Sequence, residues 1–345
     1  MNTPTQRLIG TALPTGVPAG APMAAVAGVP TPPAAATRYL AVGEGRIAYD
    51  DSGGSGPLDV GATSGIQGSK PITPEALVAA QPEVLLVLTA GLQSVGGIDG
   101  LVAIPGMGDL RSEYRALRPL LLQAGWRVVT MDVRGHGETS ARWSDYSAHA
   151  VGRDALALIE HLGGGPAVVL GNSFAAGSAL WAAHDAPARV RGVVLLGPIV
   201  RDGPPSWFAK AAVALGFGGP WRVAFWTLYW NSLFPSRKPA DHAAARAALA
   251  ANLREPGRMQ ALRTMVGLSK ADTSALVARS RVPALVVMGT RDPDFPDAAA
   301  EARWLGRALG SEPLLVDGAG HYPHLEMPET VAPALLAFLA RLDAR

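Results

Sequence analysis

The chain has 345 residues, of which 17% are charged, and its formal net charge is +2. This length suffices for one large α/β domain or for two ordinary domains. The arginines are spread along the chain without a dense basic run, which argues against nucleic acid as a partner. Cysteine is absent, so disulfides, thiolate catalysis and cysteine-ligated metals are excluded for this chain. We expect a globular protein that uses no cofactor and no metal.

The N-terminal region is rich in proline and alanine. Pro14, Pro18 and Pro22 interrupt its apolar residues, so the continuous helix of a signal peptide or membrane span is not expected here. We predict a disordered tail over residues 1–36, no integral membrane segment and a cytoplasmic location, with a weak export signal as the alternative.

Ordered structure is expected to begin with a hairpin, because "TRYLAV" and "RIAYDDSG" alternate apolar and polar residues around Gly43 and Gly45. From residue 101 the pattern changes. Apolar runs "LVAIPG", "WRVVTMD", "AVVLG" and "VRGVVLLGP" are separated by helical patterns near 112–124, 148–163 and 174–185. Buried strands that alternate with helices predict a mostly parallel central sheet flanked by helices on both faces.

Two segments interrupt this alternation. Residues 202–280 are mostly helical, after which strands resume at "ALVVMGT" and "EPLLVDGAG", and "ETVAPALLAFLARL" forms a closing helix. We therefore predict a helical cap over 202–280. The other interruption is 59–100, where a short loop would suffice to connect the hairpin to the sheet.

The segment 59–100 has a resemblance of its own. Its "KPITPEALVAAQPEVLLVLTAGLQSVGGIDGL" resembles a fragment of the periplasmic haem-binding proteins of bacterial haem transporters. Haem iron needs an axial His, Met, Cys or Tyr, and 59–100 contains none of these residues. We interpret it as an inserted structural fragment, before the strand "LVAIPG", without a haem function.

A candidate nucleophile lies in Gly171-Asn172-Ser173-Phe174-Ala175, which follows a β run and precedes an alanine-rich helix. This is the context of a nucleophile elbow, a strained turn that projects a serine hydroxyl above the sheet. The flanking residues must be small because the strand and helix backbones approach closely. The alternative is a serine that only caps the helix N-terminus.

A serine attacks a carbonyl only when a base removes its proton and an acid orients that base. His321 lies in a Gly-rich loop after the last strand, and Asp292 follows the strand "ALVVMGT". Both loops leave the carboxyl edge of the sheet, where the sites of α/β proteins form. We predict His321 as the base and Asp292 as the acid. Asp294, Asp297 and Asp202 remain alternatives for the acid.

The oxyanion of an acyl-transfer reaction needs amide donors that are already in place. Phe174 follows the candidate nucleophile and would supply one N–H, and Met107 in the loop "PGMGD" would supply the other. Gly106 and Gly108 allow this loop to come close to a substrate.

Together these parts resemble the α/β-hydrolase fold superfamily of serine esterases, lipases and carbon–carbon hydrolases. The resemblance spans 101–345 and rests on "PGMGD", "MDVRGHGETS", "GNSFAAG", "GTRDPD" and "GAGHYPHLEMPE". It implies an α/β-hydrolase domain over 37–345. It also implies a catalytic triad and an oxyanion hole, formed by Ser173, Asp292, His321, Met107 and Phe174. Pro105 stands where many members have His, and Ala175 where Gly is usual, but neither change removes a catalytic group.

Other polar residues of these motifs are expected to be structural. His136 has no second metal ligand at a useful spacing, and the resemblance implies that Asp132, Arg134 and His136 brace a loop. His324 is expected to be buried in its loop without a catalytic role.

Aromatic residues are concentrated in the predicted cap. Trp226 and Trp230 are one helical turn apart, as are Phe225 and Tyr229, so their helix has a broad apolar face. That face can be the core of the cap, the wall of an apolar substrate pocket, or both. We predict Trp226 and Trp230 as pocket residues.

These expectations describe a carboxylesterase that cleaves a small apolar ester through an acyl-enzyme intermediate. A serine nucleophile argues against epoxide hydrolase and dehalogenase chemistry, for which this fold uses aspartate. The same triad could instead cleave a carbon–carbon bond, a thioester or a lactone, or act as a cofactor-free peroxidase. A non-catalytic small-molecule binding protein on the same scaffold is the alternative of another class. The oligomeric state is left open.

Overall fold

The computed structural model describes residues 36–52, 100–163, 165–203 and 207–343. The predicted tail and the predicted insert therefore lie outside the described residues, except for Ala36 and Gly100. Within these ranges, no helix is long and apolar enough to cross a membrane.

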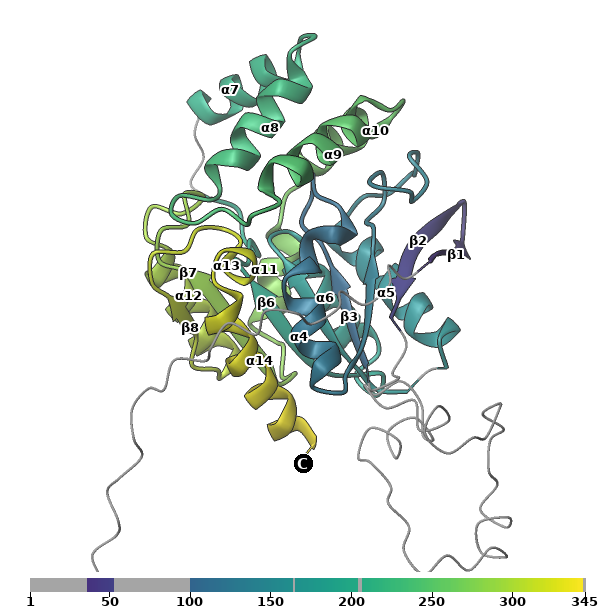
Figure 1. The fold of residues 1–345 in the computed structure, drawn as a ribbon, viewed down its shortest axis with the longest axis vertical. Helices are drawn as coiled ribbons and strands as arrows, with labels where there is room; N and C mark the ends of the chain where they lie inside the picture. The colour runs from purple at the N-terminus through teal and green to yellow at the C-terminus, as the bar shows by residue number, and fades with distance from the viewer. Residues whose placement is uncertain (1–35, 53–99, 164, 204–206, 344–345) are drawn as a thin grey trace, which may run out of the picture. The chain divides into compact units, whose positions relative to one another are not determined.

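The described strands form one eight-stranded sheet in the order β1-β2-β4-β3-β5-β6-β7-β8 (Figure 1). Their bounds are β1 Thr37–Val42, β2 Gly45–Asp51, β3 Gly100–Ile104, β4 Arg127–Met131, β5 Ala167–Asn172, β6 Val190–Leu196, β7 Ala284–Gly289 and β8 Leu314–Val316. The β1–β2 hairpin joins β4 in antiparallel pairing, and all pairs from β4 to β8 are parallel. Both the predicted hairpin and the predicted mostly parallel sheet are confirmed.

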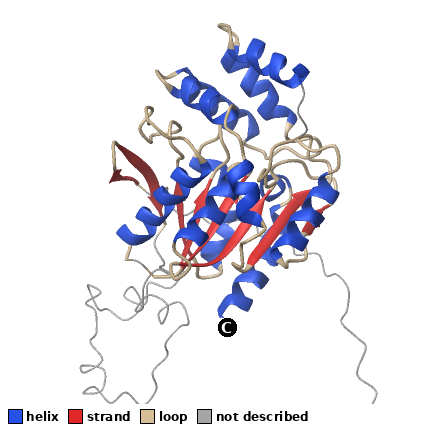
Figure 2. Ribbon diagram, turned by 180° about the vertical axis from the view of Figure 1, so that it is seen from behind, coloured by secondary structure: helices blue, strands red, loops and turns tan. Residues whose placement is uncertain are grey.

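Helices cover both faces of this sheet (Figure 2). In β3, Val102 and Ile104 face one apolar core and Leu101 and Ala103 face the other, because successive side chains of a strand point to opposite faces. The first core is closed by α5 Ala148–His161, α6 Ala175–Asp185, α11 Ala271–Val277 and α12 Ala298–Leu309. The second core is closed by α4 Leu117–Gln123 and α14 Pro328–Asp343.

The segment predicted as one helix over 112–124 has two parts. A 3₁₀-helix, η1 Arg111–Arg115, precedes α4. Pro119 is the third residue of α4, and proline is best tolerated in the first turn of a helix, where its missing N–H is not needed. Pro119 therefore favours a helix start close to its own position.

The cap consists of α7 Trp207–Phe217, α8 Arg222–Ser232, α9 His242–Arg254 and α10 Arg258–Val266, and these helices lie above the sheet (Figure 1). Buried side chains of α8, α9 and α10 share one apolar cluster with Tyr322, which follows β8, and with Leu325 of the short helix α13 Pro323–Glu326. Helix α11 packs on α6 and α12 instead. The predicted cap interval of 202–280 thus includes one helix that belongs to the layer flanking the sheet.

Candidate active site

Ser173 occupies a strained turn between β5 and α6. Its φ of 56° is the only positive φ of a non-glycine residue in the described chain, and such a left-handed conformation costs an L-residue about 1–2 kcal/mol. The N-cap position of α6 is Phe174, without a side-chain cap, so the turn does not use Ser173 as an ordinary capping residue. The Ser173 side chain lines a cavity under the cap instead.

The sequence around the turn explains how this strain is held. A Cβ atom on Gly171 would lie 2.1 Å from the carbonyl oxygen of Ala175, so β5 and α6 pack together only when residue 171 is glycine. Ala175 itself is fully buried in the first core, and its methyl group is accommodated where glycine is usual in similar motifs.

His321 and Asp292 come together from the loops after β8 and β7. The Nδ1 atom of His321 lies 2.8 Å from Oδ2 of Asp292, and both side chains are buried. The backbone holds the histidine loop in two places: its N–H donates to the carbonyl of Leu233 in the cap, and its carbonyl accepts from the Asn172 side chain. With Nδ1 bonded to Asp292, Nε2 is the ring nitrogen left to act on a substrate.

A second carboxylate lies close to the same imidazole. Oδ2 of Asp294 is 3.5 Å from Nδ1 of His321, and the Tyr229 hydroxyl of α8 donates to Asp294 at 2.7 Å. Burial lowers the pKa of His321, but the charges of Asp292 and Asp294 outweigh this effect and raise the pKa to about 9. Without a bound substrate, the His321 side chain is therefore mostly protonated at neutral pH.

The other carboxylates predicted as possible acids have different partners. Asp297 caps α12 by accepting from the Ala300 amide at 2.8 Å. Asp202 accepts from the Ser269 hydroxyl and the Lys270 backbone amide. Neither carboxylate is hydrogen bonded to His321 within the described part of the chain.

The loop "PGMGD" carries the Met107 amide and is held on several sides. The Gly106 amide donates to Oε2 of Glu113 at 2.9 Å, and the Gly108 amide donates to Nε2 of His136 at 2.9 Å. From the cap, the Trp226 indole donates to the Gly108 carbonyl at 2.9 Å. Gly108 has a φ of 72°, and a Cβ atom there would lie 2.2 Å from the Trp226 ring.

The amides of Met107 and Phe174 have no hydrogen-bond acceptor among the described residues. Buried amides without an acceptor are rare, because leaving them unpaired is costly. These two amides are therefore candidate donors to a bound ligand in the cavity that Met107 and Ser173 line.

Glu113 and His324 form a buried pair. Sequence analysis predicted that His324 is buried but gave no role to Glu113. Oε1 of Glu113 lies 3.0 Å from Nε2 of His324, and both side chains are fully buried. Burial raises the pKa of Glu113 to about 8 and lowers the pKa of His324 to about 3, so both groups are neutral at pH 7. The pair links η1, whose Glu113 also holds the Gly106 amide, to helix α13, which follows His321. A glutamate seven residues after Gly106 carries no sequence signal for this contact.

The polar residues of "MDVRGHGETS" are bonded to other groups of the protein, as expected for residues that support the structure. Arg134 forms a buried ion pair with Asp154 at 2.6 Å, and Asp132 pairs with Arg111. Nδ1 of His136 faces the carbonyl of Arg134 at 2.9 Å. Both of its nitrogens are thus engaged with backbone groups, and the ring supports the loop "PGMGD" through the Gly108 amide.

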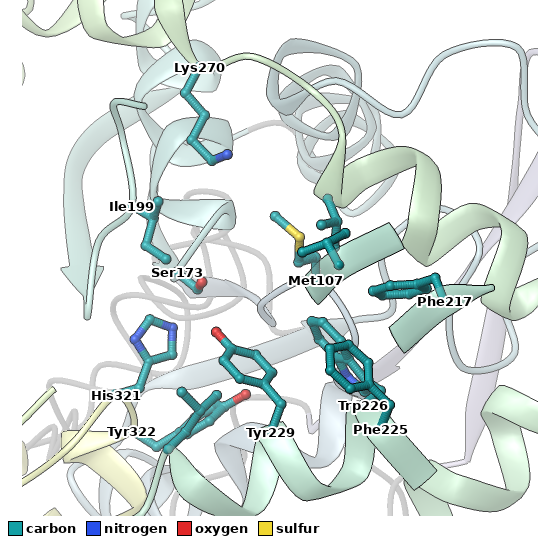
Figure 3. A pocket seen from close by; sticks show the side chains of 13 residues that line it. Met107, Ser173, Ile199, Phe217, Phe225, Trp226, Tyr229, Lys270, His321 and Tyr322 are labelled. Atoms are coloured by element: carbon teal, nitrogen blue, oxygen red, sulfur yellow. The ribbon is translucent and has the colours of Figure 1, made fainter. Parts of the chain in front are cut away.

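The cavity has a volume of about 260 Å³ and lies between Ser173 and the cap (Figure 3). Its walls are mainly apolar and aromatic, and the residues that line it are Met107, Ser173, Ile199, Val213, Phe217, Phe225, Trp226, Tyr229, Leu233, Val266, Lys270, His321 and Tyr322. Sequence reasoning did not identify Ile199 or Lys270, because they belong to connecting segments without a motif. It also missed Tyr322, which lies in the motif "GAGHYPHLEMPE" but has no signal there for a place in the cavity wall.

Of the two predicted pocket residues, Trp226 lines the cavity and Trp230 does not. The prediction for Trp230 is therefore corrected. Its ring stacks on His242 inside the cap, and its indole N–H donates to Oδ2 of Asp109 at 2.8 Å. One helical turn of separation puts two residues on one side of a helix, but the neighbouring helix decides which of them is covered.

Asp292, Asp294 and His321 also have potential ligand atoms within 4.8 Å of one another. A metal bound there would compete with Asp292 for Nδ1 of His321, which the hydrogen bond between these two residues already occupies.

The fold and the site define an α/β protein with a serine elbow, and comparison with known proteins identifies its family. Residues 101–328 match the family model described as the alpha/beta hydrolase fold. The chain belongs to this family. The predicted α/β-hydrolase fold is thus confirmed.

The relatives have diverse activities. The chain is 25% identical to 3-oxoadipate enol-lactonase 2 of Acinetobacter baylyi, over 63% of this chain and 79% of that protein. It is 28% identical to the dihydrolipoyllysine-residue acetyltransferase component of the acetoin cleaving system of Pseudomonas putida, over 72% of this chain and 65% of that protein. A thermophilic esterase from Thermogutta terrifontis superposes with a TM-score of 0.61 at 20% identity, covering 89% of this chain and 99% of that one. The last likeness shows the fold alone.

Proposed function

We propose that this protein is a serine hydrolase that cleaves a carboxylic ester with an apolar acyl or alcohol part. The observation that carries the proposal is the position of Ser173. It is held at a φ of 56° on the floor of an apolar cavity that His321 also lines, and Nδ1 of His321 lies 2.8 Å from Asp292. A strained serine, a base and an orienting acid are the parts that acyl transfer requires.

In the proposed reaction, the Ser173 hydroxyl attacks the acyl carbonyl and Nε2 of neutral His321 accepts its proton. Asp292 keeps the imidazole oriented and stabilises the imidazolium that forms. The amides of Met107 and Phe174 donate to the oxyanion. His321 then returns the proton to the leaving alcohol, which leaves an acyl ester on Ser173.

Deacylation repeats these steps with water. His321 removes a proton from the water that attacks the acyl-enzyme, and the same two amides stabilise the second tetrahedral intermediate. Collapse of this intermediate releases the carboxylic acid and returns the proton to Ser173.

The substrate part of the proposal rests on the cavity walls. Phe217, Phe225 and Trp226 face the same space as Ser173, so burial of an apolar group of the substrate contributes about 25 cal/mol for each Å² removed from water. A lactone is the second candidate, because the chain is similar to 3-oxoadipate enol-lactonase 2. A lactone is a cyclic ester, so the same serine chemistry opens it.

The test is hydrolysis of 4-nitrophenyl esters of rising acyl length by the wild type and by Ser173→Ala. Loss of a triad serine lowers kcat by about a millionfold where the triad acts as a unit. We expect the wild type to cleave these esters and Ser173→Ala to be inactive above background. Equal activity of the two proteins would contradict the mechanism, and no activity of either on esters or lactones would favour a binding protein.

A further inference from the structure

Lys270 is the only lysine or arginine among the described residues that line the cavity. It is the N-cap residue of α11, where the chain returns from the cap to the sheet layer. Figure 3 shows its side chain reaching toward the cavity on the side of Ile199 and Ser173. An ammonium group thus borders a space whose other walls are mainly apolar.

The polar contacts of this ammonium are long. Nζ is 3.4 Å from the carbonyl oxygen of Leu268 and 3.9 Å from Oδ1 of Asp202, and only 18% of the side chain is exposed. An ammonium has three N–H donors, and an optimal charge-assisted hydrogen bond is about 2.7–2.9 Å long. Lys270 therefore retains the capacity to bind a better acceptor.

Asp202 is held mainly by other donors, and the Lys270 ammonium is the smallest of the contributions that lower its pKa. Its carboxylate accepts from the Ser269 hydroxyl at 2.6 Å and from the Lys270 backbone amide at 3.0 Å. The Ser269 hydrogen bond, together with the Lys270 amide, lowers the pKa of Asp202 despite some burial. Asp202 fixes the backbone of the loop, and the Lys270 side chain is left to face the cavity.

A substrate that fills the cavity displaces water from around Nζ. A charge that loses its water needs a partner of opposite sign, because desolvation otherwise opposes binding. We propose that Lys270 recognises a carboxylate on the substrate, so that the ester cleaved at Ser173 carries an anionic group on the part that occupies this cavity. This inference rests on the proposed function and specifies its substrate class.

The number of charges favours a carboxylate over a phosphate monoester. A single lysine is a compact point charge, whereas a phosphate dianion is usually bound by an arginine fork or several cations. Among the described lining residues, the other ionisable nitrogen belongs to His321, which the proposed reaction already uses. The site therefore suits one negative charge at the end of an apolar chain or ring.

The test uses two matched pairs of esters. For an anionic acyl part, 4-nitrophenyl hydrogen glutarate is compared with its neutral methyl ester. For an anionic alcohol part, 4-carboxyphenyl butyrate is compared with 4-carbamoylphenyl butyrate. The variants are Lys270→Met, Asp202→Asn, and Lys238→Met as a matched control, since Lys238 is exposed and does not line the cavity.

We expect Lys270→Met to lower kcat/KM for the anionic member of at least one pair by about tenfold to a hundredfold, mainly through KM. The neutral member should stay within about twofold. Asp202→Asn and Lys238→Met should keep the wild-type ratio within each pair. An unchanged ratio in both pairs with Lys270→Met would refute the proposal. So would an equal loss for both members, or the same loss of preference in Asp202→Asn, because either result indicates a structural role.

A binding measurement separates this inference from the proposed function. Ser173→Ala should bind the anionic products glutarate or 4-hydroxybenzoate in calorimetry, and the double variant with Lys270→Met should lose this binding. If the esters are not cleaved but this difference is seen, the hydrolase proposal fails and the carboxylate site stands. If the esters are cleaved through Ser173 and no difference is seen, the carboxylate site fails alone.

Discussion

Asp294 is the second carboxylate beside His321, and removal of its charge should shift the pH dependence of the proposed reaction. Asp294→Asn is the appropriate change, because asparagine keeps an oxygen that can accept the hydrogen bond of Tyr229. Asp292, at 2.8 Å from the imidazole, is left in place. The substitution removes only the charge at 3.5 Å from Nδ1.

The magnitude follows from this distance. Two unit charges about 4 Å apart interact by about 1 kcal/mol in water and about 4 kcal/mol at the effective dielectric constant of a protein site. Each 1.36 kcal/mol corresponds to one pH unit. Asp294 stabilises the imidazolium, so its removal disfavours the protonated form, and the pKa of His321 falls from the wild-type value of about 9. We expect a fall of about one to three pH units.

The assay is kcat/KM against pH for one neutral ester. Only neutral His321 accepts the serine proton, so wild-type kcat/KM should rise with pH up to about 9. In Asp294→Asn the rising limb should move to lower pH, and activity at pH 7 should be maintained or increased. Asp292→Asn should instead lose about 10⁴ in kcat, as loss of the orienting aspartate does in serine proteases.

The reasoning would be refuted by an Asp294→Asn profile whose limb coincides with that of the wild type. Equal and mild losses in Asp292→Asn and Asp294→Asn would also contradict it, since they would mean that neither carboxylate alone orients His321.

Two further predictions concern the backbone of the site. Ser173→Gly should unfold in urea with a free energy about 1–2 kcal/mol above that of Ser173→Ala, because glycine adopts a φ of 56° without strain. Equal stability of these two inactive variants would show that the elbow is not strained. Glu113→Ala should lower both kcat and stability, the latter by about 1–3 kcal/mol, because the Gly106 amide loses its buried acceptor. Glu113→Gln keeps an acceptor oxygen and should retain most of the activity; if it behaves like Glu113→Ala, the hydrogen bond to Gly106 is not what matters.

Local patterns in the sequence were sufficient to predict the framework of the protein. Apolar runs bounded by glycine predicted the strands, and their alternation with helices predicted a parallel sheet. In such a sheet the loops after successive strands meet at one edge, and for that reason Ser173, Asp292 and His321 could be grouped although they are far apart in the chain. Gly171 was recognisable as well, because its requirement for a small residue comes from the adjacent turn.

Packing between distant segments was not predictable from these patterns. Trp226 and Trp230 are the same residue type and lie one turn apart on the same helix. Trp226 nevertheless lines the cavity, whereas Trp230 is covered by His242 and donates a hydrogen bond to Asp109. Packing between distant segments also decides the contact of Glu113 with His324 and the position of Lys270 at the cavity. The sequence by itself determined which strands, turns and reactive groups exist and at which edge of the sheet they meet, since these depend on neighbours along the chain. Only the tertiary structure decided which side chains face the substrate, because that depends on how the cap helices pack over the sheet.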